Sequence, residues 1–386
     1  MEARPVDVLL VGGGVASARC ARTLRRRGFS GTILLVSDEE TPPYNRPPLS
    51  KELLREDLPA ELTLAEPMSW YERRGVEMIL STGVVGLDLD ARTATLADGS
   101  RLAFGQLLLA TGAEPRRPSL PGAGRVRLLR TLPDAVALRQ AAVAGAQAVV
   151  IGGGFIGVEV ASSLAARGLR VTVLERSPAL WAGKLGEQLS AWAAERLGDA
   201  GVTVRLSTAV SSIGPTGVAL ADGTLPADIV VAGVGVEPRI QLAQAAGLVV
   251  DDGVVVDEGQ RASFASVFAA GDMARPRDGL RVEHWHAARE SGERAALAML
   301  GQPLPPARAP WIFSEVAGIT VDVVGMATAW DDAVVRGDVY AYLSGGRVVQ
   351  VAIIDGAVEV DAARRLVEAE GTSDQLAPLI AGNTAR

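Results

Sequence analysis

The sequence predicts an α/β protein with two separate units of alternating strands and helices. Two glycine clusters carry this prediction, Gly12-Gly13-Gly14 and Gly152-Gly153-Gly154, and each stands between an apolar strand-like run and a helical pattern. An acidic residue follows the next strand in both cases, Asp38 in the first and Glu175 in the second. Glycines let a backbone approach a pyrophosphate, and a helix N-terminus attracts its negative charge. The clusters therefore predict two Rossmann-like domains and two dinucleotides, which we interpret as a flavin and a nicotinamide cofactor.

The first unit begins with strand, helix and strand patterns over residues 6–11, 14–27 and 32–36. Four prolines between Thr41 and Lys51 then predict a stiff, extended segment, with Ser50 as the N-cap of the following helix. Short apolar runs in residues 76–104 alternate with turn signals, notably Asp98-Gly99, and predict a β-meander that crosses over the sheet. An apolar strand over residues 107–110 leads into Thr111-Gly112.

The second unit repeats the alternation over residues 148–151, 154–167, 170–174, 187–197 and 228–232. Beyond Ile240 the pattern returns to short strands and reaches Gly271-Asp272, where Asp272 is placed to accept a hydrogen bond from a ribityl hydroxyl. A helix over residues 285–300 and a proline-rich linker follow. Residues 311–360 read as mainly β, before a helix over residues 362–370.

Composition narrows the classes of function. A net charge of -7 gives no reason to expect nucleic-acid binding, and no apolar run is long enough for a membrane span. We see no signal or transit peptide, so we expect a soluble cytoplasmic protein. The single cysteine, Cys20, excludes an internal disulfide and a redox-active cysteine pair. The only histidines, His284 and His286, cannot build a metal site, and we expect none.

Several further segments match one known family in order along about the first 315 residues. Besides the two loops they are Tyr44-Asn45-Arg46-Pro47-Pro48-Leu49-Ser50-Lys51, Leu109-Ala110-Thr111-Gly112-Ala113, Leu129-Arg130-Thr131-Leu132, Val173-Leu174-Glu175, Gly233-Val234-Gly235-Val236, Phe268-Ala269-Ala270-Gly271-Asp272 and Val282-Glu283-His284-Trp285. The chain resembles the flavin-dependent ferredoxin reductases that serve bacterial cytochrome P450s and Rieske-type ring-hydroxylating oxygenases, the family of putidaredoxin reductase.

This resemblance implies a glutathione-reductase-like fold, with two Rossmann-like dinucleotide-binding domains and a C-terminal α+β interface domain. The implied parts are residues 1–114 and 240–306 for FAD, 115–239 for NAD(H) and 307–386 for the interface. It also implies electron transfer from NADH through FAD to a [2Fe–2S] ferredoxin that feeds a P450 or a ring-hydroxylating oxygenase. We expect a monomer or weak homodimer, with neither nucleic acid nor membrane as a partner.

The resemblance assigns site residues position by position. Those implied for the flavin are Gly12, Gly14, Ala16, Asp38, Arg46, Lys51, Val85, Thr111, Gly112, Arg130, Asp272 and Trp285. Those implied for the nicotinamide cofactor are Gly152, Gly154, Ile156, Gly157, Glu159, Glu175 and Gly235.

Lys51 and Glu159 are the implied catalytic pair. In relatives the two meet beside flavin N5, where a cation favours the electron-rich reduced flavin and the carboxylate holds the ammonium. Without the resemblance, Lys51 would equally fit a solvated residue in a first helical turn. Glu159 would equally fit a favourable charge near a helix N-terminus.

Some alternatives stay open. Glu175 favours NADH by pairing with ribose hydroxyls, whereas the adjacent Arg176 could accommodate the 2′-phosphate of NADPH. Two residues and one segment depart from the family pattern. Ser17 stands where the first loop would have its third glycine, Arg239 follows Pro238 where relatives often have asparagine, and residues 311–318 differ from the segment found in relatives. The rival functions are a rubredoxin or nitrite-reductase-type electron donor, and an NADH-responsive signalling flavoprotein. NADH peroxidases and disulfide reductases are disfavoured because their cysteine nucleophile is missing.

Overall fold

The structure, a computed structural model, describes residues 3–56 and 58–376 and divides into two compact units. Unit 1 comprises Met1–Asn45, Ala60–Glu114 and Glu237–Pro306. Unit 2 comprises Arg46–Pro59, Pro115–Val236 and Ala307–Arg386. Among the described residues, no helix is both long and apolar enough to cross a bilayer.

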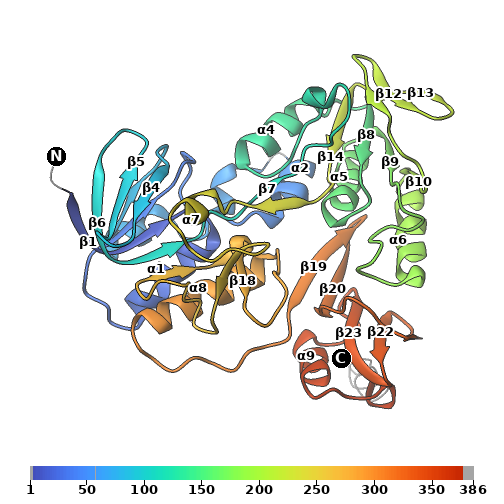
Figure 1. Ribbon diagram of the computed structural model, residues 1–386. Helices are drawn as coiled ribbons and strands as arrows, with labels where there is room; N and C mark the ends of the chain where they lie inside the picture. Colours follow the sequence, from blue (N-terminus) through green and yellow to red (C-terminus); the bar gives the residue numbers. More distant parts are fainter. Residues whose placement is uncertain (1–2, 57, 377–386) are drawn as a thin grey trace. The chain divides into compact units, whose positions relative to one another are not determined.

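Unit 1 is built on a mainly parallel sheet with the strand order β3-β2-β1-β6. Figure 1 labels β1, β6, β5 and β4 of this sheet. Strand β17 lies parallel beside β6, and β5 and β4 continue antiparallel from the other end of β6. The strands are β1 (Arg4–Val11), β2 (Ile33–Val36), β3 (Val76–Ile79), β4 (Val84–Asp88), β5 (Thr93–Leu96), β6 (Arg101–Leu109) and β17 (Val267–Ala269). The predicted meander over residues 76–104 is therefore wrong at its start. Val76–Ile79 pairs in parallel with β2, because a run of short strands and turns does not specify each strand's partner.

Helices cover both faces of this sheet. Helices α1 (Val15–Arg26) and α8 (Trp285–Met299) pack against each other on the face that buries Val8 and Leu10. The short helix α7 (Gln241–Ala245) and the β4–β5 hairpin enclose the opposite face, which buries Val6 and Val11. Unit 1 also contains α3 (Met68–Arg73), β16 (Val254–Val256) and β18 (Ala274–Pro276).

Unit 2 contains a second, wholly parallel sheet with the order β10-β9-β8-β14. Its strands are β8 (Gln147–Ile151), β9 (Arg170–Leu174), β10 (Thr203–Arg205) and β14 (Ile229–Ala232). Its larger helices are α4 (Leu132–Ala141), α5 (Phe155–Ala166) and α6 (Glu187–Asp199). A separate antiparallel sheet comprises β11 (Ser212–Ile213), β12 (Gly217–Leu220) and β13 (Gly223–Pro226). Strands β7 (Ala113–Pro115) and β15 (Val236–Pro238) pair where the chain leaves and re-enters unit 1.

The C-terminal part of unit 2 is an antiparallel sheet with the order β19-β20-β23-β22-β21. The strands are β19 (Trp311–Val316), β20 (Ile319–Gly325), β21 (Asp332–Arg336), β22 (Val339–Ser344) and β23 (Arg347–Ile354). Helix α9 (Val360–Glu368) packs on β20 and β23, and β19 packs on α5. Ser344 pairs with Arg347, so Gly345 and Gly346 form the turn of the hairpin between β22 and β23.

Residues 46–59 pack with unit 2, although the chain enters and leaves them from unit 1. They form the 3₁₀ turn Pro47–Ser50 and the short helix α2 (Glu52–Arg55), which contacts α4 and α5. The N-cap of α2 is Lys51, so the prediction that Ser50 caps this helix is wrong. The Ser50 hydroxyl instead donates a hydrogen bond to Glu159.

Candidate functional site

The first glycine loop leaves room for a negatively charged ligand at the start of α1. Gly12 has a φ of +115°, and a Cβ there would collide with the carbonyl oxygen of Ala110. Gly14 is the N-cap of α1, with no side chain capping the helix and no atom within 4 Å of where its Cβ would lie. No side chain therefore caps the start of α1, and its first-turn N–H groups suit a pyrophosphate.

The second loop repeats this geometry at the start of α5. Gly152 has a φ of +107°, and a Cβ would lie 2.5 Å from the carbonyl oxygen of Gly233. Gly154 caps α5 without a side-chain hydrogen bond. A Cβ on Gly157 would collide with the carbonyl oxygen of Gly152, so only glycine lets α5 approach the loop this closely. Both loops fit the pyrophosphate of a dinucleotide.

Ser17 occupies the position in the first loop that Gly157 occupies in the second. Its side chain is fully buried, and its hydroxyl has no hydrogen-bond partner among the described residues. The first loop thus accommodates a small side chain that the second excludes. A buried hydroxyl without a partner still costs desolvation energy.

Asp38 lies beyond the end of β2, as predicted, but it already has a partner in unit 1. Its Oδ2 accepts a hydrogen bond from Nη2 of Arg239 at 2.8 Å, and both side chains remain partly exposed. The backbone of Arg239 is held in turn, because its N–H donates to Gly112 and its carbonyl accepts from the Thr111 hydroxyl. Three predicted flavin residues therefore converge on Arg239, a residue that the sequence marks only as a departure.

Two more predicted flavin residues of unit 1 have defined surroundings. Gly271 has a φ of +75°, and its N–H donates to the Ser291 hydroxyl, which fixes the turn that presents Asp272. The Trp285 indole donates to Asn45 at 2.7 Å, in the proline-rich segment. In unit 2, Arg46 and Arg130 are brought together by a hydrogen bond from the Arg46 guanidinium to the Arg130 carbonyl.

The carboxylate of Glu175 is fixed at the end of β9 by two backbone donors. Its Oε2 accepts from the N–H of Gly153 at 2.6 Å and its Oε1 from the N–H of Ser177 at 2.7 Å. A hydrogen bond therefore joins the second glycine loop directly to Glu175. The side chain of Arg176 points into solvent.

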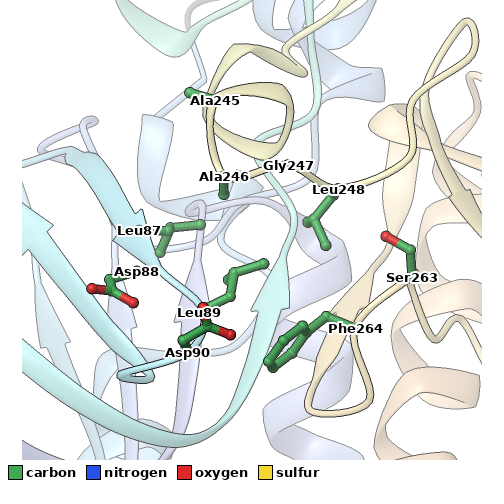
Figure 2. A pocket seen from close by; sticks show the side chains of 10 residues that line it. All are labelled: Leu87, Asp88, Leu89, Asp90, Ala245, Ala246, Gly247, Leu248, Ser263 and Phe264. Atoms are coloured by element: carbon green, nitrogen blue, oxygen red, sulfur yellow. The ribbon is translucent and has the colours of Figure 1, made fainter.

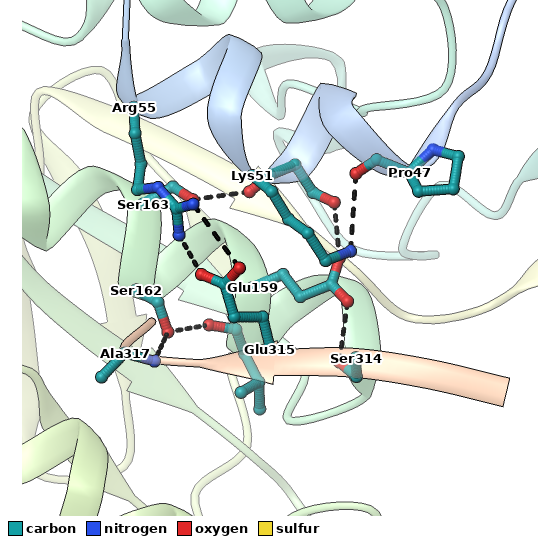
Figure 3. Close-up of polar contacts among 11 residues, drawn as sticks. Pro47, Lys51, Arg55, Glu159, Ser162, Ser163, Ser314, Glu315 and Ala317 are labelled. Carbon is teal, nitrogen blue, oxygen red and sulfur yellow. Dashed lines mark hydrogen bonds and ion pairs between the residues drawn. The ribbon is translucent and has the colours of Figure 1, made fainter. Parts of the chain in front are cut away.

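Lys51 and Glu159 form an ion pair inside unit 2 (Figure 3). The distance from Nζ to Oε2 is 2.8 Å, and the side chains are only 8% and 3% exposed. The Lys51 ammonium also faces the Pro47 carbonyl and lies 5.4 Å from the ring centre of Phe313 on β19. The interpretation of Lys51 as a solvated residue is therefore wrong.

Sequence reasoning did not find the other groups that meet this pair. Ser50 and Ser314 both donate hydrogen bonds to the Glu159 carboxylate. Arg55 of α2 forms an ion pair with Glu315 of β19 nearby. The only signal was the departure of residues 311–318 from the family pattern, and it did not indicate a contact with α5.

The remaining predicted site residues are not brought together by contacts of this kind. Val85 and Ile156 are exposed, with 63% and 43% of their surface accessible.

A cavity of about 430 Å³ opens in unit 1 beside the turn after β4 and the end of α7, and no predicted site residue lines it (Figure 2). Two of its polar side chains already accept backbone hydrogen bonds, Asp88 from Ala91 and Ser263 from Val249. No three His, Cys, Asp or Glu side chains gather as metal ligands within residues 3–56 and 58–376.

The sequence of unit 1 and of the second nucleotide fold matches a single family. Residues 6–292 match the family described as pyridine nucleotide-disulphide oxidoreductase. The chain belongs to this family. Residues 311–380 match a second family, described as reductase C-terminal. The chain is thus an oxidoreductase of a family that uses a flavin and NAD(P)H, and the predicted α/β fold class is confirmed.

Similar proteins cover the whole length of this pyridine nucleotide-disulphide oxidoreductase. It is 35% identical to the anthranilate 1,2-dioxygenase system ferredoxin–NAD(+) reductase component of Burkholderia cepacia, over 95% of both chains. It is 36% identical to the biphenyl dioxygenase system ferredoxin–NAD(+) reductase component of Paraburkholderia xenovorans, over 91% of this chain and 88% of that one. A crystal structure of a covalent putidaredoxin reductase–putidaredoxin complex matches with a TM-score of 0.91 and 31% identity over 100% of both chains.

The family name includes disulphides, but this member has no cysteine that could form one within the chain. Cys20 is the single cysteine and is buried in α1. Burial raises the pKa of the Cys20 thiol, so the thiol stays protonated and is not a nucleophile.

Proposed function

We propose that this oxidoreductase carries electrons from NADH to a [2Fe–2S] ferredoxin that feeds a P450 or a ring-hydroxylating oxygenase. FAD is assigned to the first glycine loop in unit 1 and NADH to the second loop in unit 2. When bound, FAD accepts a hydride from NADH and passes electrons on singly, which is the chemistry that a one-electron acceptor requires. A cytoplasmic location and a monomeric or weakly dimeric state belong to the same proposal.

The observation that carries the proposal is the pair of uncapped glycine loops together with a lone buried cysteine. Gly14 and Gly154 leave two separate helix N-termini open to a pyrophosphate. Cys20 offers no thiolate to receive electrons from a flavin. Two dinucleotides without a dithiol favour direct transfer to an external acceptor. The relatives named as ferredoxin–NAD(+) reductase components support ferredoxin as that acceptor.

Within this proposal, Asp38 and Asp272 hold the hydroxyl groups of FAD. Arg46, Lys51, Val85, Thr111, Gly112, Arg130 and Trp285 are proposed as further flavin contacts. Glu175 is proposed to accept the ribose hydroxyls of NADH, because a carboxylate held at the strand end repels a 2′-phosphate. Lys51 is proposed to supply positive charge at flavin N5, with Glu159 as its counter-ion.

The proposal is tested by mixing the purified FAD-bound protein with NADH in a stopped-flow instrument, followed by a screen of [2Fe–2S] ferredoxins and rubredoxins. We expect rapid loss of the oxidised flavin absorbance and multiple-turnover reduction of at least one ferredoxin. Turnover with rubredoxin alone would favour that rival donor function. Slow turnover with every acceptor and a long-lived reduced flavin–NAD complex would favour the signalling function.

A further inference from the structure

We propose that Ser50 and Ser314 are positioning residues for the Lys51–Glu159 pair, which makes strand β19 part of the machinery for flavin reduction. This inference rests on the proposed function and deepens it. It concerns two hydroxyl groups from segments that are far apart in the sequence and that meet on one carboxylate.

The two serines satisfy the two oxygens of Glu159 separately. Ser314 Oγ donates to Oε1 at 2.7 Å, and Ser50 Oγ donates to Oε2 at 2.5 Å. Oε2 also faces the Lys51 ammonium at 2.8 Å. Both serines are buried, with exposed fractions of 1% for Ser314 and 3% for Ser50. A buried carboxylate is costly unless it is paired and hydrogen-bonded, and this carboxylate is both.

The serines are themselves held against α5. The backbone N–H of Ala317 donates to the Ser162 hydroxyl, which anchors the end of β19 on the helix. The Ser163 hydroxyl donates to the backbone carbonyl of Ser50 at 2.6 Å, which anchors the other segment. These contacts fix the backbone on either side of Glu159, so the two serine hydroxyls lie within hydrogen-bond distance of the carboxylate.

Two arginines near the Lys51–Glu159 pair make contacts with other groups. Arg55 is paired with Glu315, and the Arg167 guanidinium donates to the Arg55 carbonyl. Lys51 is thus the cation that faces the carboxylate of Glu159 directly. Its position depends on that carboxylate and on the Phe313 ring, whose face attracts the ammonium.

Loss of a serine donor has a defined electrostatic consequence. The carboxylate loses a neutral donor that spreads its charge, and it becomes free to move away from Lys51. The first change strengthens the negative charge that opposes the Lys51 ammonium, and the second removes the contact that holds the ammonium in one position. The reduced flavin then becomes less favourable relative to the oxidised flavin, and its reduction potential falls.

The experiment compares Ser314→Ala and Ser50→Ala with two reference variants in the FAD-bound protein. Ser314→Thr keeps the hydroxyl and suits a β-strand. Ser190→Ala removes a buried hydroxyl from α6 that is not a donor to Glu159. For each variant we measure FAD content, the dissociation constant of NAD⁺, the stopped-flow rate of flavin reduction by NADH, and the flavin reduction potential.

We expect Ser314→Ala to slow flavin reduction about tenfold, as loss of one hydrogen bond to a charged group would. The two-electron potential should fall by about 30 mV, the equivalent of a tenfold change in the equilibrium constant. FAD content and NAD⁺ affinity should stay at the wild-type values. Ser314→Thr should restore both rate and potential, and Ser190→Ala should change neither.

A double-mutant cycle with Glu159→Gln separates positioning from packing. In the Glu159→Gln background, Ser314→Ala should cost little, because the charge that the serine positions is already absent. An equal loss in both backgrounds would show a packing role and overturn the inference. So would a wild-type rate for Ser314→Ala while Glu159→Gln is slow. Failure of NADH to reduce the wild-type flavin would instead contradict the proposed function.

Discussion

Replacing Lys51 by methionine removes an ammonium group but keeps a side chain of similar length. If the charge acts on the flavin, Lys51→Met should slow reduction by NADH by roughly 100-fold, as for loss of one preorganised electrostatic contact. FAD should stay bound, because Lys51 is held by unit 2 residues and is not the anchor of the first loop. The stopped-flow flavin absorbance measures the rate directly.

The variant also leaves Glu159 buried without its cation, so its stability must be followed. Removing one partner of a buried pair costs about 3–5 kcal/mol, whereas removing both costs less. Lys51→Met combined with Glu159→Gln should therefore regain stability but not rate. Recovery of the rate in the double variant would make the pair a structural salt bridge only.

Glu175 sets the expected preference for NADH over NADPH. Because its two oxygens accept N–H groups of Gly153 and Ser177, alanine would disturb the loop as well as the charge. Glu175→Gln keeps an acceptor oxygen and removes the charge. It should narrow the ratio of the two kcat/KM values by about tenfold, since a hydrogen bond to a charged group contributes about 1.5–3 kcal/mol. An unchanged ratio that shifts with Arg176→Ala would assign the selectivity to the arginine.

At the scale of elements, helices α1 and α5 carry different residues at one matching position of their first turns, Ser17 in α1 and Gly157 in α5. The Ser17 hydroxyl is buried without a described partner, so Ser17→Ala should preserve or raise stability, by up to about 1 kcal/mol. Gly157→Ser should instead be strongly destabilising, because a Cβ there collides with the Gly152 carbonyl. Thermal unfolding at saturating FAD and NAD⁺ compares the two. Equal tolerance of serine at both positions would contradict the packing difference.

Strand β20 carries a buried carboxylate whose ionisation opposes folding. Burial raises the pKa of Asp322, and this effect exceeds the opposing hydrogen bond from the Trp311 indole. The folded protein therefore binds this proton more tightly than the unfolded chain. Its contribution to stability is largest at acid pH and is lost as the pH rises through the raised pKa. Asp322→Asn should be more stable than the wild type at pH 7, and the difference should disappear only as the pH is lowered below 3.8, the ordinary pKa of an aspartate carboxyl. Urea unfolding across this pH range measures it.

The sequence predicted most of what is local in these elements. The glycine loops, the acidic ends of β2 and β9 and the strand–helix alternation are encoded within short windows, so their physical signals survive without tertiary structure. The sequence predicts Ser50 as a helix cap because serine before a short helix is a common capping signal. The cap is instead Lys51. The hydrogen bond from Ser50 to Glu159 joins residues 109 positions apart, and the hydrogen bond from Ser314 to Glu159 joins residues 155 positions apart. No local sequence pattern can therefore predict either contact. The partner of Val76–Ile79 was missed for the same reason.

At the scale of the whole molecule, each unit has its own nucleotide loop and its own core, so the two cofactors should leave separate signatures. Hydrogen exchange measured by mass spectrometry should show protection of residues 12–18 by FAD and of residues 152–158 by NAD⁺. Each ligand should protect its own glycine loop even at concentrations where the other site is empty. Protection of both loops by FAD alone would contradict the assignment of one dinucleotide to each loop.

The path of residues 46–59 has a consequence for how the protein is made. These residues leave the ribosome early, yet Arg55 finds its partner Glu315 only 260 residues later. At a synthesis rate of 5–20 residues per second, this wait lasts roughly 13–52 s. During that time Lys51 and its neighbours have no completed surroundings, although the first glycine loop and β1 are already outside. A nascent chain stalled before β19 should thus expose this proline-containing segment to proteases and chaperones, and one stalled after β19 should not.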